Sequence, residues 1–406
     1  MSASSAVQPA RTPSLQIGSP YPDFLVSLDL PVSLPLPVWA AHLDRTLDQH
    51  QHAADTPECQ LRRHAAIAGC YNQAGLVETH FGRLPIAGTL CEAALHWHSH
   101  QLRGAGASLA RFAFQPYVNQ SRLERIFSHF DTAIAMMEAL SRALDGQQDA
   151  HFGPLTVTHT HWLAIAAEHP QSLCVLRILC TVEILKTLLK AERYHEILTR
   201  LREVPRDNAV LDGYAREAAL IATIRGGNLT EAVRLGDAFL HLSSNENQPV
   251  FLYRAAELAA IQGDTARSLT LARSLCSRFG TSIPLDNPSN LKRMACTTRL
   301  LACLHAEEAG EAAARGLEAA TAIDDVLLRV DFLSVIRQSA TAPASLESNV
   351  EMERLRRESL YGAARTAENA TQSEGGRIID ALTGRLLRLS RHNGLPVNGI
   401  RASPAW

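Results

Sequence analysis

Histidines and a carboxylate at helical spacing are the residues of this sequence that could perform chemistry. The densest group lies in the segment CEAALHWHSH, Cys91–His100. On a helix, Glu92, His96 and His100 follow one another at intervals of four residues and share one face. Histidines at this spacing can bind zinc or iron, so the row is a candidate metal site. A metal-dependent enzyme or accessory factor that uses Zn, Fe or haem is therefore one hypothesis for the chain.

Further ligands would have to come from other elements, because one helix offers only neighbouring positions. Thirteen of the 17 histidines precede residue 170, and those considered are His42, His50, His52, His64, His80, His159 and His161. The sequence has no HExxH motif and no recurring Glu-x-x-His pair. In the alternative, structural interpretation, the histidines lie at the surface or hydrogen-bond between helices, with Trp97 turned toward the core. We favour this second interpretation and expect no cofactor.

Motifs of the common enzyme classes are missing from the sequence. There is no Walker A loop, no dinucleotide-binding glycine fingerprint and no Gly-x-Ser-x-Gly elbow. Gly226-Gly227 lies between two expected helices without a preceding strand, which argues against a phosphate-binding loop there. We therefore expect a non-catalytic protein.

The composition excludes several classes of partner and compartment. The chain has 406 residues, and its formal net charge of -2 provides no field that would attract nucleic acid or an anionic membrane. The eight cysteines form no Cys-x-x-Cys pair and mostly lie in apolar helical patterns, as in a reducing compartment. No basic stretch followed by an apolar one opens the sequence, and charges interrupt the longest apolar run, Leu173–Leu189. We expect a cytoplasmic protein that does not enter a membrane.

Helical periodicity extends over most of the chain after residue 37, which predicts an all-α fold. The expected helices are Arg62–Thr79, Ile86–Gly104, Arg122–Leu144, Trp162–Glu168, Leu173–Lys190, Glu192–Glu203, Leu211–Arg225, Leu229–Leu242, Val250–Gln262, Thr265–Phe279, Leu291–Glu308, Gly310–Ala322, Asp324–Ala340, Val350–Asn369 and Gly376–Arg391. The β-branched run Leu155–Thr158 is isolated among them.

Changes in composition divide the chain into four parts. Residues 1–38 form an arm with five prolines after residue 19. We expect residues 1–20 to be disordered and residues 20–38 to lie against the body of the protein as an extended strap. A partner-binding motif in residues 20–38 is the alternative. Residues 39–150 form a His-rich helical region, and residues 151–340 hold helical repeats. Residues 341–406 hold C-terminal helices and a tail. The amphipathic last helix would cap the array with a polar outer face.

Three turns between helices can be overlaid in the second half of the chain. They are KAERYHEIL (Lys190–Leu198), RGGNLTEAV (Arg225–Val233) and IQGDTARSL (Ile261–Leu269), with a weaker copy at His305–Ala313. Glu192, Gly227 and Gly263 occupy equivalent positions, 35 and 36 residues apart. A period of about 34 residues built from two helices is typical of a solenoid, in which stacked helix pairs share one core.

At these residues the chain resembles the tetratricopeptide-repeat (TPR) family. Gly263-Asp264 followed by Ser268, and Gly227-Asn228 followed by Ala232, match that family's turn and the small residue five positions on. Tyr194 and Ala256 fit its aromatic and small positions, whereas the Trp, Leu-Gly and Tyr of the first helix are mostly missing and the terminal Pro is absent. The resemblance covers about residues 170–320. It implies a superhelical array of antiparallel helix hairpins with a concave groove for a peptide or protein.

An earlier hairpin is expected in the stretch His64–Leu84, with its turn at Gln73–Gly75. The function that we expect from the sequence is a non-catalytic scaffold or adaptor that holds a protein or peptide partner in the groove of its helical repeats. Such a protein could serve a biosynthetic, regulatory or secretion system, and self-association is left open.

Overall fold

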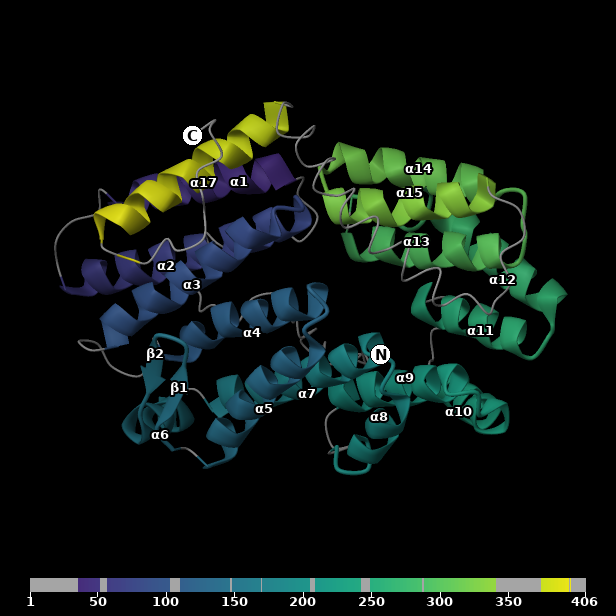
Figure 1. Cartoon of the computed structure of the whole chain (residues 1–406), viewed down its shortest axis with the longest axis horizontal. Coiled ribbons are helices and arrows are strands. Elements are labelled where there is room, and N and C mark those ends of the chain that lie inside the picture. Colours follow the sequence, from purple (N-terminus) through teal and green to yellow (C-terminus); the bar gives the residue numbers. More distant parts are fainter. Residues whose placement is uncertain are drawn as a thin grey trace, which may run out of the picture.

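The computed structural model describes residues 36–51, 57–102, 110–146, 148–168, 170–204, 209–241, 249–286, 288–340, 374–393 and 395. Within these ranges nearly the whole chain is helical, which confirms the all-α prediction (Figure 1). Residues 1–35 of the arm and the expected helix Val350–Asn369 lie outside the described residues. None of the described helices is long and apolar enough to cross a bilayer.

The described chain forms 16 helices and one β-hairpin. In the first half these are α1 (Leu36–Gln51), α2 (Pro57–His80), α3 (Leu84–Leu102), α4 (Ala110–Ile126), α5 (Phe130–Gly146), β1 (Ala150–Phe152), β2 (Leu155–Val157), α6 (His159–Glu168), α7 (Pro170–Lys190) and α8 (Tyr194–Arg200). In the second half they are α9 (Ala209–Arg225), α10 (Leu229–His241), α11 (Pro249–Ile261), α12 (Thr265–Arg278), α13 (Pro288–Cys303), α14 (Ala309–Ala322), α15 (Val326–Ala340) and α17 (Glu374–His392). Figure 1 shows the helices following one another around an arch whose ends approach each other near α2 and α15.

The start of α1 differs from the expected extended arm. Leu36, Pro37 and Val38 open this helix, because proline is tolerated in a first turn, where the backbone N–H has no partner within the helix. The β-branched run after residue 154 also differs from expectation, since it is the second strand of an antiparallel hairpin. Trp162 of α6 donates its indole N–H to the carbonyl of Gln148 at 2.8 Å and stacks on Phe114 of α4.

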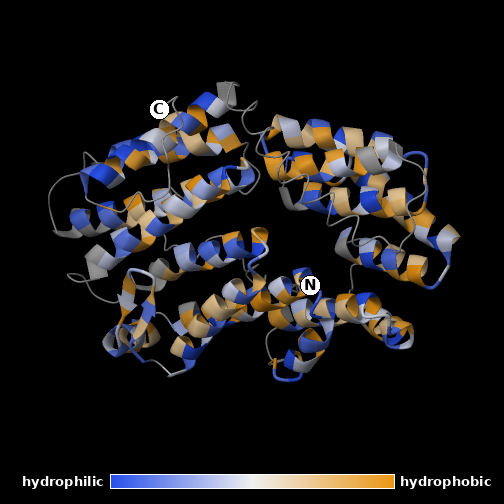
Figure 2. Ribbon diagram, viewed as in Figure 1, coloured by the Kyte–Doolittle hydropathy of each residue, from blue (hydrophilic) through white to orange (hydrophobic). Residues whose placement is uncertain are grey.

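Apolar residues collect on the faces where helices meet (Figure 2). The main cluster of buried side chains extends from α1 to α9 and includes residues of α15 and α17. Tyr71, Phe81 and Trp162 are among its largest fully buried members. A second cluster surrounds Phe332 and joins α12, α13, α14 and α15. Buried contacts thus join helices that follow one another in sequence and also tie α15 and α17 to the first helices.

Seven described helix ends share one turn, in which a single residue has a left-handed backbone. These residues are Gly82, Ser128, Glu192, Gly227, Gly263, His305 and Asp324. The N–H of Gly263 bonds the carbonyl of Ala260, and the next N–H, of Asp264, bonds the carbonyl of Ala259. The other six turns repeat both bonds at the same offsets. This Schellman arrangement satisfies carbonyls that a helix end would otherwise leave open.

The predicted equivalence of Glu192, Gly227 and Gly263 is therefore confirmed in the turn backbone. The regularity also extends to the side chains on either side of the turn. Ser268 donates its hydroxyl to the carbonyl of Ala256 at 2.7 Å, a pair that spans the turn between α11 and α12. Ser121 and Ala133 make the corresponding bond at 3.0 Å between α4 and α5.

The prediction of a turn at Gln73–Gly75 is wrong. Helix α2 runs through this segment without a break and ends in the turn at Gly82. Gly75 is instead a point where α3 comes close, because a Cβ there would lie 2.9 Å from the sulfur of Cys91 and 3.3 Å from the carbonyl of Ala87. The glycine serves the packing of two helices and not a reversal of the chain.

Helix α17 packs on the first helices of the chain. The hydroxyl of Tyr71 donates to the carbonyl of Leu386 at 2.9 Å and accepts from Ser390 at 2.9 Å. Arg385 pairs with Asp44 and Asp48 of α1 at 3.0 and 2.9 Å. The last described helix thus covers α1 and α2, and its exposed side carries arginines such as Arg377, Arg388 and Arg391.

The two ends of the arch are joined between α2 and α15. The N–H of Leu36 bonds the carbonyl of Ile323 at 3.1 Å, and His80 Nδ1 lies 2.8 Å from Asp325 Oδ2. Asp325 is fully buried, and its Oδ1 accepts from the N–H of Leu328 at 3.0 Å. One carboxylate therefore caps the start of α15 and holds the end of α2.

Exchanging residues in two of the turns should shift stability in opposite directions. Glu192 is exposed and has a φ of 58°, so Glu192→Gly removes left-handed strain and should raise the free energy of unfolding by about 0.5–1 kcal/mol. Gly227→Ala places a Cβ in open space at a φ of 79° and should lower that free energy by a similar amount. Urea denaturation followed by circular dichroism measures both changes. Shifts of the same sign would contradict the prediction.

The contact between His80 and Asp325 should make stability depend on pH. Burial lowers the pKa of His80, but the charge of Asp325 and the hydrogen bond to it outweigh burial and raise the pKa above its ordinary value. Because the folded pKa is the higher one, protonated His80 stabilises the fold fully below its unfolded pKa, and this contribution is lost as pH rises through the folded pKa. Denaturation curves over that range should show a smaller loss in His80→Gln than in the wild type. Equal losses would show that His80 does not carry the effect.

Candidate functional site

The predicted metal row is only partly assembled in the structure. Glu92 Oε1 lies 3.8 Å from His96 Nε2, and these side chains are 40% and 25% exposed. The side chain of His100 lies outside what the structure describes. Within the described residues, no group of three or more His, Cys, Asp or Glu side chains is placed to hold a metal ion.

Two of the other histidines considered as ligands make separate contacts. His80 holds Asp325, and His161 Nδ1 lies 2.9 Å from the hydroxyl of Thr158 at the start of α6. In the described chain His42, His50, His64 and His159 join no metal group either, and His52 is outside it. Burial lowers the pKa of His98 to about 4, so this 2% exposed side chain is neutral. His98 is thus buried more deeply than its neighbour Trp97, which is partly buried and packs against the main core, as the structural interpretation predicted.

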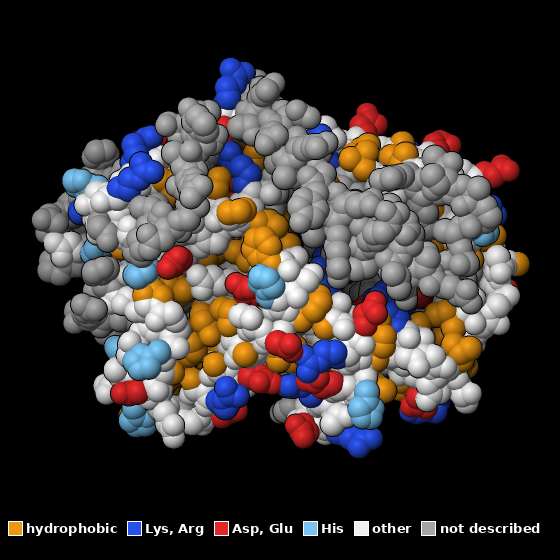
Figure 3. All heavy atoms as spheres, viewed as in Figure 1, with side chains coloured by type: hydrophobic (Ala, Val, Ile, Leu, Met, Phe, Trp, Pro, Cys, Tyr) orange, Lys and Arg blue, Asp and Glu red, His pale blue; other side chains and the backbone are white. Residues whose placement is uncertain are grey.

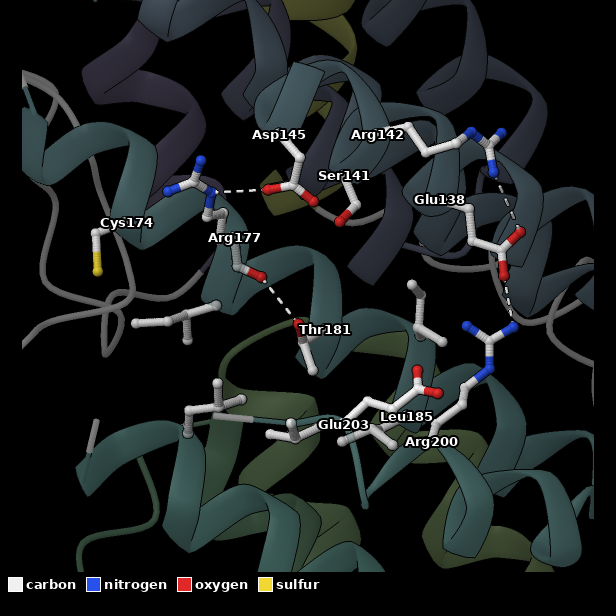
Figure 4. A pocket seen from close by; sticks show the side chains of 14 residues that line it. Glu138, Ser141, Arg142, Asp145, Cys174, Arg177, Thr181, Leu185, Arg200 and Glu203 are labelled. Carbon is white, nitrogen blue, oxygen red and sulfur yellow. Dashed lines mark hydrogen bonds and ion pairs between the residues drawn. The ribbon is translucent and has the colours of Figure 1, made fainter. Parts of the chain in front are cut away.

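A groove of about 800 Å³ lies between α5, α7 and α9 and is bordered by the end of α8 (Figure 4). It exists because α7 and α8 differ in length. Helix α7 has 21 residues and α8 only seven, which correspond to about 32 and 10 Å of helix. Helix α8 starts right after the turn at Glu192, so it covers the C-terminal part of α7 and leaves the N-terminal part open.

The floor of the groove is apolar. Ile178 of α7 and Leu211 of α9 are buried there, and Val204 packs against them. These residues form a small cluster of their own, separate from the main core. An apolar floor of this kind can take up a hydrophobic side chain of a partner.

The rim of the groove carries charges of both signs. Glu138 accepts one hydrogen bond from Arg200 at 2.5 Å and lies 3.9 Å from Arg142. On the opposite side Arg177 pairs with Asp145 at 3.2 Å (Figure 4). Figure 3 shows charged side chains of both signs on the surface in the region of α5 and α8. The pair of Arg177 and Asp145 is exposed, so it contributes little to stability and is available to a partner, whereas Glu138 and Arg200 are about one third exposed.

No residue of the groove was among the candidates from the sequence. Its lining consists of ordinary helical residues whose types carry no special chemistry. One local feature of the sequence could have indicated the groove. The segment between the turn at Glu192 and Pro205 holds only 12 residues, too few for a helix as long as α7.

Comparison of the chain with models of protein families, with curated proteins and with solved structures finds no match. The site is therefore interpreted from its own residues.

The thiols of the chain should differ sharply in reactivity, and the reactive one should be the cysteine that lines the groove. Cys174 is exposed on the groove wall, whereas Cys70, Cys91 and Cys180 are buried, and burial raises the pKa of each of these three to about 12. N-ethylmaleimide should modify Cys174 in the native protein and leave the three buried thiols unmodified, because thiolate and access are both required. Peptide mass spectrometry after a short pulse measures this. Modification of a buried thiol at the rate of Cys174 would contradict the described packing.

Proposed function

We propose that the protein is a non-catalytic helical-repeat scaffold that binds a peptide segment of a protein partner in the groove between α5, α7 and α9. The observation that carries the proposal is the groove itself, with its apolar floor and its charged rim. Its volume of about 800 Å³ falls in the range of specific binding sites. The cytoplasmic location expected from the sequence belongs to the same proposal.

A TPR-like solenoid is the architecture that we propose for the helix pairs. Two lines of support are the shared turn at seven helix ends and the spacing of 35 and 36 residues between Glu192, Gly227 and Gly263. A third is that contacts run mainly from one helix to its neighbours in sequence. Arrays of this kind present extended surfaces to their partners.

The chemistry of the groove favours an amphipathic peptide. A hydrophobic side chain would lie on Ile178, Val204 and Leu211, where water is displaced. Charged residues of the peptide would exchange partners with Arg177 and Asp145 on the rim. Apolar anchors flanked by charge are the usual pattern when a helix binds in a groove.

Photo-crosslinking from inside the groove tests the proposal. A benzoylphenylalanine at Ser141, which lines the groove, should crosslink one protein in native lysate. The same group at Ser274, an exposed position on α12, serves as the matched control and should not. Val204→Glu places a charge on the floor and should reduce the Ser141 crosslink at least about tenfold, since an unpaired charge against an apolar anchor costs more than 1.4 kcal/mol.

Two outcomes would overturn the proposal. One is the same set of crosslinked proteins from both positions, and the other is a Ser141 crosslink that Val204→Glu leaves unchanged in a folded protein.

Elemental analysis of the purified chain addresses the metal hypothesis separately. Stoichiometric Zn or Fe that is lost in His96→Ala would favour a metal-dependent protein instead.

A further inference from the structure

A second, smaller cavity lies between α7, α9 and α11, and we call it the inner pocket. It has a volume of about 210 Å³. Most of its lining is aliphatic and comes from α7 and α9, with Leu185, Leu189 and Ile221 among these residues. In another protein, a cavity of about 150 Å³ with aliphatic and aromatic walls is enough to bind benzene. The inner pocket is therefore large enough for one aliphatic side chain.

Polar groups of both charges also line this pocket. Lys186 of α7 and Glu217 of α9 come from different walls, and Arg254 of α11 lies beside Glu217. The side chain of Lys186 is 44% exposed and Tyr214, which also lines the pocket, is 37% exposed. The pocket thus opens to solvent beside Lys186 and Tyr214, so the polar end of a ligand can lie at this opening.

The ammonium of Lys186 has donors to spare. Its Nζ lies 3.6 Å from the buried carboxylate of Glu183 and 5.5 Å from the centre of the Tyr214 ring, and it makes no hydrogen bond within the part of the chain that the structure describes. Glu183 does not depend on this lysine, because Arg122 and Arg125 bond the same carboxylate at 2.9 and 2.6 Å. The N–H donors of Lys186 are therefore available to a ligand that carries an acceptor.

The carboxylate of Glu217 is held through one of its two oxygens. Its Oε1 accepts from Nε and Nη2 of Arg254 at 3.0 and 2.8 Å, and Arg254 also donates to Glu257 at 2.6 Å. Among the described residues, no group donates to Oε2 of Glu217. Arg254 thus fixes the carboxylate in place, and the second oxygen can accept from a cationic group of a ligand.

We propose that the inner pocket binds a free α-amino acid with an aliphatic side chain. Its carboxylate pairs with Lys186, its ammonium pairs with Glu217, and its side chain packs against Leu189 and Ile221. Groups of opposite charge on two walls match a zwitterion, whereas a simple anion would be repelled by Glu217 and a simple cation by Lys186. The inner pocket is separate from the groove, although Leu185 borders both, and binding there goes beyond the proposed scaffold function.

Titration calorimetry with the full chain at neutral pH, with L-leucine as the probe, tests the proposal. Leucine should bind saturably. Leucinamide lacks the carboxylate, N-acetylleucine lacks the ammonium and glycine lacks the side chain, so each of these analogues should bind at least about tenfold more weakly than leucine.

Two variants assign the charged contacts to their residues. Lys186→Met keeps an unbranched apolar side chain and removes the ammonium, so it should bind leucine weakly and no better than leucinamide. Glu217→Gln keeps an acceptor for Arg254 and removes the negative charge, so it should no longer prefer leucine to N-acetylleucine. Each variant should therefore lose one discrimination and keep the other.

Lys190→Met is the matched control, because Lys190 is exposed one turn further along α7 and does not line the pocket. This variant should bind leucine as the wild type does. The absence of saturable leucine binding to the wild type, binding of any of the three analogues as tight as that of leucine, or equal affinities of Lys186→Met and Lys190→Met would each overturn the proposal. The analogues are compared on the wild type, so that comparison decides even where a variant does not fold. The crosslink from Ser141 is independent of all these results.

Discussion

The helix pairs of this chain depend on one turn, in which a single left-handed residue ends a helix and points the chain toward the next. The two hydrogen bonds of the turn are made by successive N–H groups, so the reversal is decided within a few neighbouring residues. At Gly263 the next residue, Asp264, accepts from the N–H of Arg267 at 3.0 Å and begins α12. Asn228 and Asp325 cap their helices in the same way, at 3.3 and 3.0 Å. Where one turn both ends a helix and caps the following one, the angle between the two helices has little freedom.

Some of these turns bring small residues together. At Gly263 and Ser128 the residues seven positions before the turn and five positions after it are small and share a hydrogen bond, Ala256 with Ser268 and Ser121 with Ala133. Gly75 holds the earlier position before Gly82 and leaves room for α3. At Glu192 the same two positions hold Leu185 and Ile197, so the turn itself does not require small residues. Where two helices do approach closely, alanine, serine and glycine occupy the facing positions.

Features decided by neighbouring residues could be predicted from the sequence, and features decided by distant contacts could not. The turn at Glu192 could be aligned with the two glycine turns because the residues around it carry the pattern. Gly75 was misread because a glycine required by packing and a glycine required by backbone conformation look the same in a sequence. The pair of Arg385 with Asp44 joins residues 341 positions apart, so no local pattern announces it. The Glu92–His96 contact could be predicted because the two residues are four positions apart on one helix. A third ligand would have to come from a distant element, so its absence among the described residues could not be predicted.

Helix α7 lines two cavities with different faces. Residues Cys174, Ile178 and Thr181 follow one another at helical spacing and face the groove, while Val182, Lys186 and Leu189 do so on the side of the inner pocket. Glu183 is buried beside them, and burying a carboxylate costs several kcal/mol unless charges and hydrogen bonds compensate it. The cations that compensate it are fixed in place by that contact.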